Sequence, residues 1–257
     1  MDKPAPTNRI NPPFLISISL FALFAFLIFR NGEKWARQLL IYLSHAGWAR
    51  NIVSNWSISW RVASRFIAGT DREAAIATTK AMNQKGMLVT LDYLGESCTS
   101  EGEALHARAE IIRLLDDIHN HKLQANVSLK PTQLGLKIDP ELALENICAL
   151  VEKAKTVGNF IRIDMEDHPT TDATLNLYRH LRYKANLHNV GVVIQSYLYR
   201  SEEDINQLVE DGARVRLCKG AYAEPPEVAY PQKADVDANY LNLSRLLLTP
   251  TARANGI

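Results

Sequence analysis

Charged and amide side chains recur at the ends of short apolar segments in this sequence. Lys130, Asp164 and Gln195 each close such a segment, and Arg216 and Lys219 mark the end of another. A lysine or an arginine supplies a fixed positive charge that stabilises negative charge on a bound molecule. A neighbouring carboxylate orients such a cation and keeps it charged, because opposite charges favour ionisation of each other. These residues therefore indicate a candidate site, provided that the fold brings them together.

Taken one at a time, the same residues have simpler explanations. Lys130 fits a solvated loop lysine, Asp164 a helix cap, and Gln195 or Arg216 a partner for loop backbone groups. Most of the acids in the segment that follows Asp164 are expected to face water, and His168, next to a proline, is interpreted as a loop histidine and not as a ligand. A polar group at the end of each successive segment nevertheless favours a common site.

The elements that must position these side chains alternate regularly from residue 86 onward. Apolar segments predict strands, and amphipathic patterns between them predict helices. Asp139 and Pro140 mark one helix start, and Ser201 is expected to be the N-cap of another, with acids in its first turn. The predicted strands span residues 87–94, 125–130, 159–164, 190–195 and 213–218, and the predicted helices cover residues 101–119, 140–155, 171–185, a segment from Ser201 onward, and 233–248.

This alternation predicts parallel strands joined by right-handed crossovers, in either a doubly wound sheet or a (β/α)8 barrel. A doubly wound sheet usually has a glycine-rich phosphate turn after its first strand, but Leu94 is followed by Gly-Glu. Barrels place function at the carboxyl ends of several strands, where Asp92, Glu96 and Glu166 join the residues above. We therefore expect an α/β fold, a partial (β/α)8 TIM-type barrel of about five units preceded by N-terminal helices.

Composition narrows the class of protein. The chain has 257 residues, of which 47% are hydrophobic and 22% charged, so it can form a packed core. Its net charge of +1 argues against a nucleic-acid partner. The three cysteines have neither zinc-site nor paired spacing, which fits a reducing compartment and predicts no metal site. We expect a cytoplasmic protein.

The N-terminal region has a different character. Residues 14–29 contain no charge, and as a helix they would span about 24 Å, slightly less than the roughly 30 Å of a bilayer core. Residues 30–65 then contain six basic residues against one acid, together with all four tryptophans. These features fit a membrane helix, with contact through residues 14–60 at the inner face, or a helix buried on the main domain. A signal peptide is disfavoured, because no small-residue cleavage site follows. We expect an apolar segment 1–30, a helical region 31–85 and an incomplete barrel 86–257.

Four ordered segments resemble those of the proline dehydrogenase family, most closely its short monofunctional bacterial form. They are Val127–Leu136, Ile161–Asp167, Val193–Arg200 and Arg216–Tyr222. The resemblance extends from about residue 60 to about residue 245, in the same order and with similar spacing.

The resemblance implies a distorted (β/α)8 barrel that oxidises L-proline to Δ1-pyrroline-5-carboxylate with FAD and passes the electrons to a membrane quinone. It also implies a role for each matched residue. These are Asp164 and Arg216 as catalytic residues, Lys130 and Tyr222 in substrate binding, and Met165, Gln195, Lys219, Gly220 and Ala221 in cofactor binding.

The family pattern continues with three further β-α units beyond the position of Ile257. From this we expect a truncated copy of the barrel. The alternative function is a catalytically inactive fragment that acts at most as a membrane-associated interaction module. A third possibility, another flavin barrel such as a folate reductase, is disfavoured by the four segments.

Overall fold

The fold was derived from a computed structural model, which describes residues 68–69, 71–95 and 97–254, together with Gly32, Tyr42 and Ala46. The chain divides into two compact units, Met1–Ile67 and Ala68–Ile257. The description below concerns the second unit. The expected boundaries at residues 30 and 85 remain a prediction.

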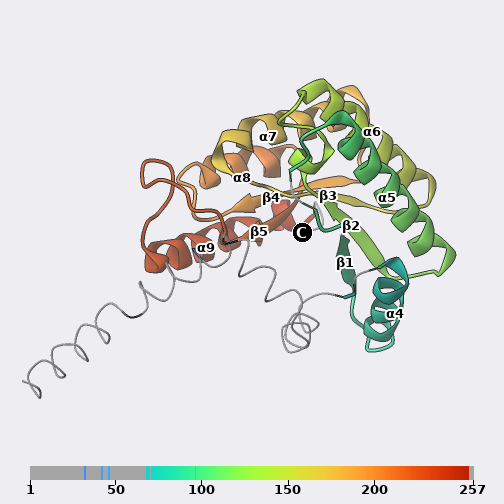
Figure 1. Ribbon diagram of the computed structural model, residues 1–257. Coiled ribbons are helices and arrows are strands. Elements are labelled where there is room, and N and C mark those ends of the chain that lie inside the picture. Colours follow the sequence, from blue (N-terminus) through green and yellow to red (C-terminus); the bar gives the residue numbers. More distant parts are fainter. Residues whose placement is uncertain are drawn as a thin grey trace, which may run out of the picture. The chain divides into compact units, whose positions relative to one another are not determined.

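The second unit alternates strands and helices along its length (Figure 1). Its strands are β1 (Val89–Asp92), β2 (Ala125–Leu129), β3 (Ile161–Ile163), β4 (Val190–Gln195) and β5 (Arg214–Cys218). Its helices are α4 (Arg72–Asn83), α5 (Glu101–Asn120), α6 (Pro140–Thr156), α7 (Thr171–Arg179), α8 (Ser201–Glu210), α9 (Lys233–Leu247) and α10 (Pro250–Ala254). Short helical turns η1 (Pro131–Leu134) and η2 (His168–Thr170) follow β2 and β3, and a π-helical turn η3 (His180–Lys184) extends α7.

Each predicted strand and helix is present, with ends that differ by a few residues. Local capping explains two of the helix starts. The Asp139 side chain accepts a hydrogen bond from the Glu141 amide at 3.0 Å, with Pro140 at the first helical position of α6. In α5, the Ser100 hydroxyl accepts one from the Glu103 amide at 3.3 Å.

One cap prediction was wrong. Ser201 is the first residue of α8 and not its N-cap, because the N-cap position is taken by Arg200. The Ser201 hydroxyl instead donates a hydrogen bond to the backbone oxygen of Gln195 at 2.5 Å. This hydrogen bond ties the start of α8 to the end of β4. The acids expected in the first turn of α8 are present.

The five strands form one parallel sheet in the order β1-β2-β3-β4-β5. Because sequence neighbours are also neighbours in the sheet, the order never reverses as it does in a doubly wound fold. The strands curl into a half-barrel, and helices α5 to α8 cover its outer face (Figure 1). The expected partial barrel is therefore confirmed.

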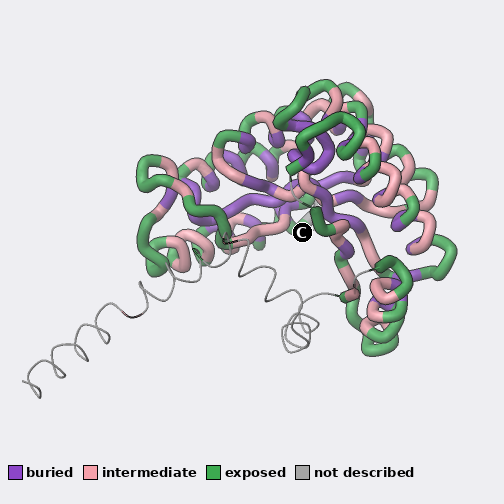
Figure 2. The backbone as a smooth tube through the Cα atoms, in the orientation of Figure 1, coloured by how far each residue is buried: buried purple, intermediate pink, exposed green. Residues whose placement is uncertain are grey.

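The core lies between the sheet and those helices. Successive side chains of a strand point to opposite faces, and Val127, Leu129, Ile161, Ile163 and Val192 are fully buried on the helix side. Figure 2 shows this buried layer running through the strands and the inner faces of the helices. The helical contribution repeats every three or four residues and includes Ala107, Ile111, Leu115, Ile147, Leu150, Leu175, Tyr178, Ile205, Leu208, Leu243 and Leu247.

The expected membrane segment at residues 14–29 and most of the contact region 14–60 lie outside the described residues. Within the part of the chain that the structure describes, no helix is long and apolar enough to cross a bilayer.

Candidate functional site

The face of the sheet turned away from α5 to α8, here called the concave face, is polar. The register aligns Asp92 with Ser128, Ser128 with Arg162, and Val193 with Arg216. Alternation along each strand therefore gives a packed apolar side and a charged side within the same sheet. The charges lie toward the carboxyl ends of the strands, where barrels carry their sites.

The centre of the concave face is a junction of three side chains from three elements. Asp164, directly after β3, forms an ion pair with Arg216 of β5. The Ser128 hydroxyl of β2 donates to Asp164 Oδ1 at 2.6 Å and accepts from Arg216 Nη2 at 3.3 Å. The backbone positions the aspartate as well, because the Asp164 amide donates to the Leu129 oxygen at 2.8 Å. The prediction that Asp164 orients Lys130 or Arg216 is met, within the described residues, by Arg216.

Asp92 and Lys130 extend this charged group toward β1 and β2. Burial, and then the charge of Asp164, raise the pKa of Asp92, while Lys130 and Arg216 act in the opposite direction. One oxygen of Asp92 is buried without a hydrogen-bond partner in the described residues. Lys130 is half-buried at the end of β2, as the sequence predicted.

A second buried positive charge lies next to the junction. Burial, and then the neighbouring Arg216, lower the pKa of Arg162 to about 10. Its guanidinium donates to the Arg214 oxygen at 3.2 Å and lies 5.0 Å from the centre of the Phe160 ring. The concave face thus concentrates positive charge around a small number of carboxylates.

Gln195 and Met165 lie at the carboxyl ends of β4 and β3 and contact each other. The Gln195 side-chain amide donates to the Met165 oxygen at 3.1 Å, and both residues are buried. The other end of the Gln195 amide, Oε1, is buried and has no hydrogen-bond partner in the described residues. Buried polar atoms are nearly always paired, so this oxygen is an acceptor for a bound group.

Glu166 corrects the expectation that the acids after Asp164 mostly face water. It is buried, and its carboxylate accepts from the Thr132 amide at 2.9 Å and from the Thr132 hydroxyl at 2.7 Å. Glu166 therefore fixes the turn after β3 to the turn after β2. Its type and position did not distinguish it from a solvated loop acid, because its partner lies 34 residues away.

The segment after β5 places its residues differently. The Lys219 ammonium donates to Asp237 of α9 at 2.5 Å, and Ala221 is exposed. Gly220 has a φ of 109°, and a Cβ there would lie 2.5 Å from the Tyr197 ring, so only glycine fits. Burial, and then the charge of Glu166, raise the pKa of Tyr222 to about 12, which places its hydroxyl near the carboxylates that follow β3.

The structure therefore brings together Asp164 with Arg216 and Met165 with Gln195, and it places Lys130 close to Asp92. Lys219, Gly220, Ala221 and Tyr222 lie on the loop that follows β5. Sequence reasoning missed Ser128 and Glu166. Ser128 could have been found, because it lies two residues before Lys130 and therefore on the same face of β2. No described cluster of histidine, cysteine and acidic side chains could hold a metal ion.

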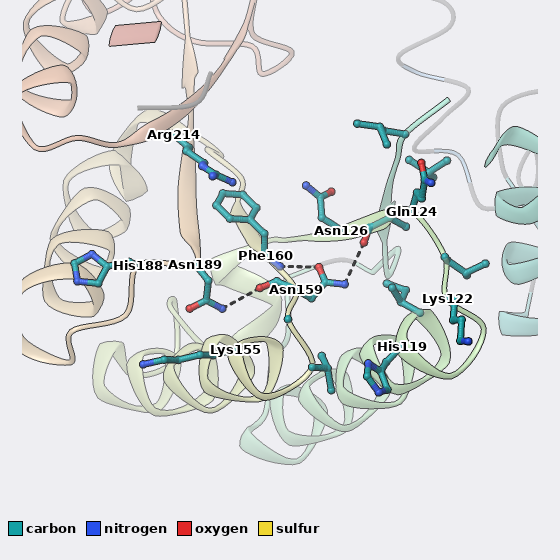
Figure 3. A pocket seen from close by; sticks show the side chains of 17 residues that line it. His119, Lys122, Gln124, Asn126, Lys155, Asn159, Phe160, His188, Asn189 and Arg214 are labelled. Atoms are coloured by element: carbon teal, nitrogen blue, oxygen red, sulfur yellow. Dashed lines mark hydrogen bonds between the residues drawn. The ribbon is translucent and has the colours of Figure 1, made fainter. Parts of the chain in front are cut away.

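A cavity of about 960 Å³ lies at the opposite, amino ends of the strands (Figure 3). Amide side chains line it and bind backbone groups. Asn159 donates to the Ala125 oxygen at 3.1 Å, and Asn189 donates to the oxygens of Val151 at 3.0 Å and Asn159 at 3.1 Å. Its charged lining is basic and includes His119, Lys122, Lys155, His188 and Arg214.

Comparisons with known proteins agree with this geometry. A family model described as proline dehydrogenase matches residues 75–256. Proline dehydrogenase 2 of Bacillus subtilis is 37% identical over 209 residues, which cover 81% of this chain and 68% of that protein. Proline dehydrogenase of Deinococcus radiodurans is 40% identical over 187 residues, covering 72% of this chain and 60% of that protein.

Solved structures give the same fold. Proline utilization A of Bdellovibrio bacteriovorus, inactivated by N-propargylglycine, superposes with a TM-score of 0.68 at 26% identity, covering 77% of this chain and 25% of that one. The protein of the same name from Bradyrhizobium japonicum, at 20% identity and a TM-score of 0.59, shows the fold alone. The matched residues 75–256 contain the half-barrel and its charged concave face, and the chain belongs to the proline dehydrogenase family.

Proposed function

We propose that the concave face oxidises L-proline to Δ1-pyrroline-5-carboxylate with FAD as the cofactor. Family membership supports an oxidoreductase that acts on proline. The chain spans 60% to 68% of the length of the relatives compared here, so the activity of those proteins enters as a proposal for this one.

The observation that carries the proposal is a pair of unsatisfied buried atoms on one face of the sheet. Gln195 Oε1 is an acceptor without a partner, and Arg216 Nε is a donor without a partner, among the residues that the structure describes. A flavin ring presents both N–H donors and nitrogen acceptors along its edge. The two residues that the resemblance assigns to the flavin therefore each retain one atom of the type needed to bind it.

The side chains of this chain would divide the work of substrate binding and charge stabilisation. The Lys130 ammonium would bind the proline carboxylate, since a fixed cation holds the substrate in a reactive orientation. Arg216 would stabilise the negative charge that develops during the reaction, and Asp164 with Ser128 would hold its guanidinium in place. When bound, FAD would supply the acceptor for the hydride that leaves carbon 5 of proline.

The remaining site residues would line the cofactor and the substrate. Met165 lies beside Gln195 and would contact the flavin ring. Gly220 and Ala221 would let the backbone approach the cofactor, and Tyr222 would cover the substrate. Lys219 would reach the cofactor only by leaving Asp237, since its ammonium is bound there.

The test is spectroscopic. Purified chain is incubated with FAD and dialysed, and its visible spectrum is recorded before and after anaerobic addition of L-proline. A yellow protein that L-proline bleaches, and that N-propargylglycine inactivates as it does the Bdellovibrio protein, supports the proposal. A colourless protein that remains folded by circular dichroism would favour the alternative, an inactive fragment.

Lys130→Ala tests the substrate contact separately. We expect the KM for proline to rise at least tenfold while FAD remains bound, because a charged hydrogen bond contributes about 1.5–3 kcal/mol. Steady-state kinetics with a dye acceptor, together with the flavin absorbance, measures both. Unchanged proline kinetics would reject this role for Lys130.

We also propose that the electrons pass to a membrane quinone and that residues 14–60 contact the membrane. Flotation with anionic lipid vesicles, compared between the full chain and one that begins near Asn31, tests the contact. Equal flotation of both would exclude residues 14–29 as the anchor.

A further inference from the structure

The loop between β5 and α9, residues 219–232, is fixed along the turn that follows β4 (Figure 1). The Tyr197 amide donates to the Lys219 oxygen at 3.0 Å, and the Tyr230 amide donates to the Tyr197 oxygen at 2.8 Å. These hydrogen bonds hold the two ends of the loop. Tyr222 lies between them and is not fixed by them.

A buried carboxylate fixes the middle of this loop. The Glu224 side chain is 4% exposed, although the loop around it is on the surface. Its Oε1 accepts from the His168 amide at 2.8 Å and from the Tyr197 hydroxyl at 3.2 Å. Its Oε2 lies 2.5 Å from His168 Nδ1. Three donors therefore satisfy one buried charge, as such a charge requires.

These donors come from two other strand-end turns. His168 lies four residues after Asp164 in the turn after β3, and Tyr197 lies two residues after Gln195 in the turn after β4. The Tyr197 ring also packs against Gly220 at the start of the loop. Burial, followed by the charge of Glu224, raises the pKa of the Tyr197 hydroxyl, which therefore stays protonated and able to donate. One carboxylate thus joins the turns that follow β3, β4 and β5.

The arrangement restricts where Tyr222 can be. Pro225 and Pro226 follow Glu224 and restrict the backbone on that side. Moving the loop would leave the Glu224 carboxylate buried without its donors or expose it with loss of all three hydrogen bonds. Tyr222, two residues before Glu224, is therefore kept next to the carboxylates that follow β3.

We propose that Glu224, His168 and Tyr197 are positioning residues that fix the β5–α9 loop and so place Tyr222 over the substrate. The role of Tyr222 rests on the proposed function, whereas the fixing of the loop does not. The three residues act through the loop and do not touch the reacting atoms.

Hydrogen exchange measures the loop directly and needs neither FAD nor proline. Glu224→Gln should accelerate exchange of the His168 amide and of the amides in residues 219–230 by about ten- to a hundredfold, since the lost bonds involve a charged acceptor. His168→Ala should give a smaller change in the same segments, because that side chain is 38% exposed and its loss leaves the backbone donor. Glu227→Gln is the matched control, because Glu227 lies exposed in the same loop.

Steady-state kinetics of the FAD-loaded chain then tests the effect on Tyr222. Glu224→Gln and His168→Ala should raise the KM for proline more than they lower kcat, with flavin absorbance retained. Tyr197→Phe should act in the same direction, while Glu227→Gln should match the unmodified chain.

The outcomes separate the two proposals. Exchange rates in Glu224→Gln and His168→Ala equal to those of Glu227→Gln would overturn the positioning role. Faster exchange with an unchanged KM would overturn the part that concerns Tyr222. Faster exchange in a chain that never oxidises proline would refute the proposed function and leave the fixing of the loop established.

Discussion

The two ends of the same five strands use polar side chains in opposite ways. At the carboxyl ends, Asp164 and Arg216 bind each other, and polar atoms remain unsatisfied on the concave face. At the amino ends, Asn83, Asn159 and Asn189 donate to backbone oxygens of neighbouring segments. Asn83, for example, binds the oxygens that flank the start of β1 and β2, at 2.9 and 3.1 Å.

The difference separates chemistry from stability. A side chain whose partners are backbone groups completes the hydrogen bonding of the fold and has little capacity left for a ligand. A side chain whose partners are other charged groups, with donors or acceptors to spare, is available to a bound molecule. In barrels generally, the carboxyl ends carry function and the amino ends contribute stability.

The largest effect is expected for a matched pair of arginines on β5. Arg214 and Arg216 lie two residues apart on the same face, but Arg216 pairs with Asp164, whereas Arg214 lies over the Phe160 ring at 5.2 Å. Arg216→Ala should lower kcat for proline by about 100- to 1000-fold, as the loss of other charge-stabilising donors does. Arg214→Ala should keep kcat within about threefold of the unmodified chain. Comparable losses in the two variants, at equal flavin content, would contradict the division between the two ends.

Asn189→Ala is expected to show the opposite behaviour. It removes the donor to two backbone oxygens, of Val151 and Asn159, at the amino ends. The free energy of unfolding should fall by about 1–3 kcal/mol, because partly buried acceptors lose their partner. Urea unfolding measures this change, and turnover per folded, flavin-loaded molecule should stay unchanged. A fall in turnover without a fall in stability would place Asn189 in the active machinery.

Asp92→Asn tests the smallest expected effect, a pH dependence of stability. Burial and the charge of Asp164 raise the pKa of Asp92 above its ordinary value of 3.8. The folded chain therefore holds this proton more tightly than the unfolded chain, and the associated stability is lost as the pH rises through the folded pKa. Asparagine carries no such penalty. In the chain without FAD, Asp92→Asn should be more stable than the unmodified chain at pH 7, with a smaller difference near pH 4.

Urea midpoints at both pH values measure this difference. An equal difference at pH 4 and pH 7 would show that ionisation of Asp92 is not its cause.

Particular residues show how far sequence reasoning reached. The alternation of apolar segments and amphipathic patterns predicted all five strands and the helices between them, because each pattern depends on near neighbours in the chain. The positions of Lys130, Asp164, Gln195 and Arg216 at strand ends followed from the same pattern. Ser201 was misassigned as an N-cap, because its actual partner, the Gln195 oxygen, lies at the end of a strand six residues away.

Long-range partners were beyond such reasoning. Glu166 and Glu224 resemble ordinary loop acids in sequence, yet one is bound to Thr132 and the other to His168, 56 residues distant. The environment of a loop carboxylate depends on which other loops the strand order brings beside it. That order is a property of the assembled sheet.

The sequence by itself determined the local elements, the family resemblance and the residue types available at each strand end, because propensity and periodicity act over a few residues. Only the tertiary structure decided which of those residues meet. Parallel register places Ser128, Asp164 and Arg216 at one point although 88 residues separate the first from the last. It also gives the buried carboxylate of Glu224 its donors, because a charge can be buried only where the folded chain brings partners to it.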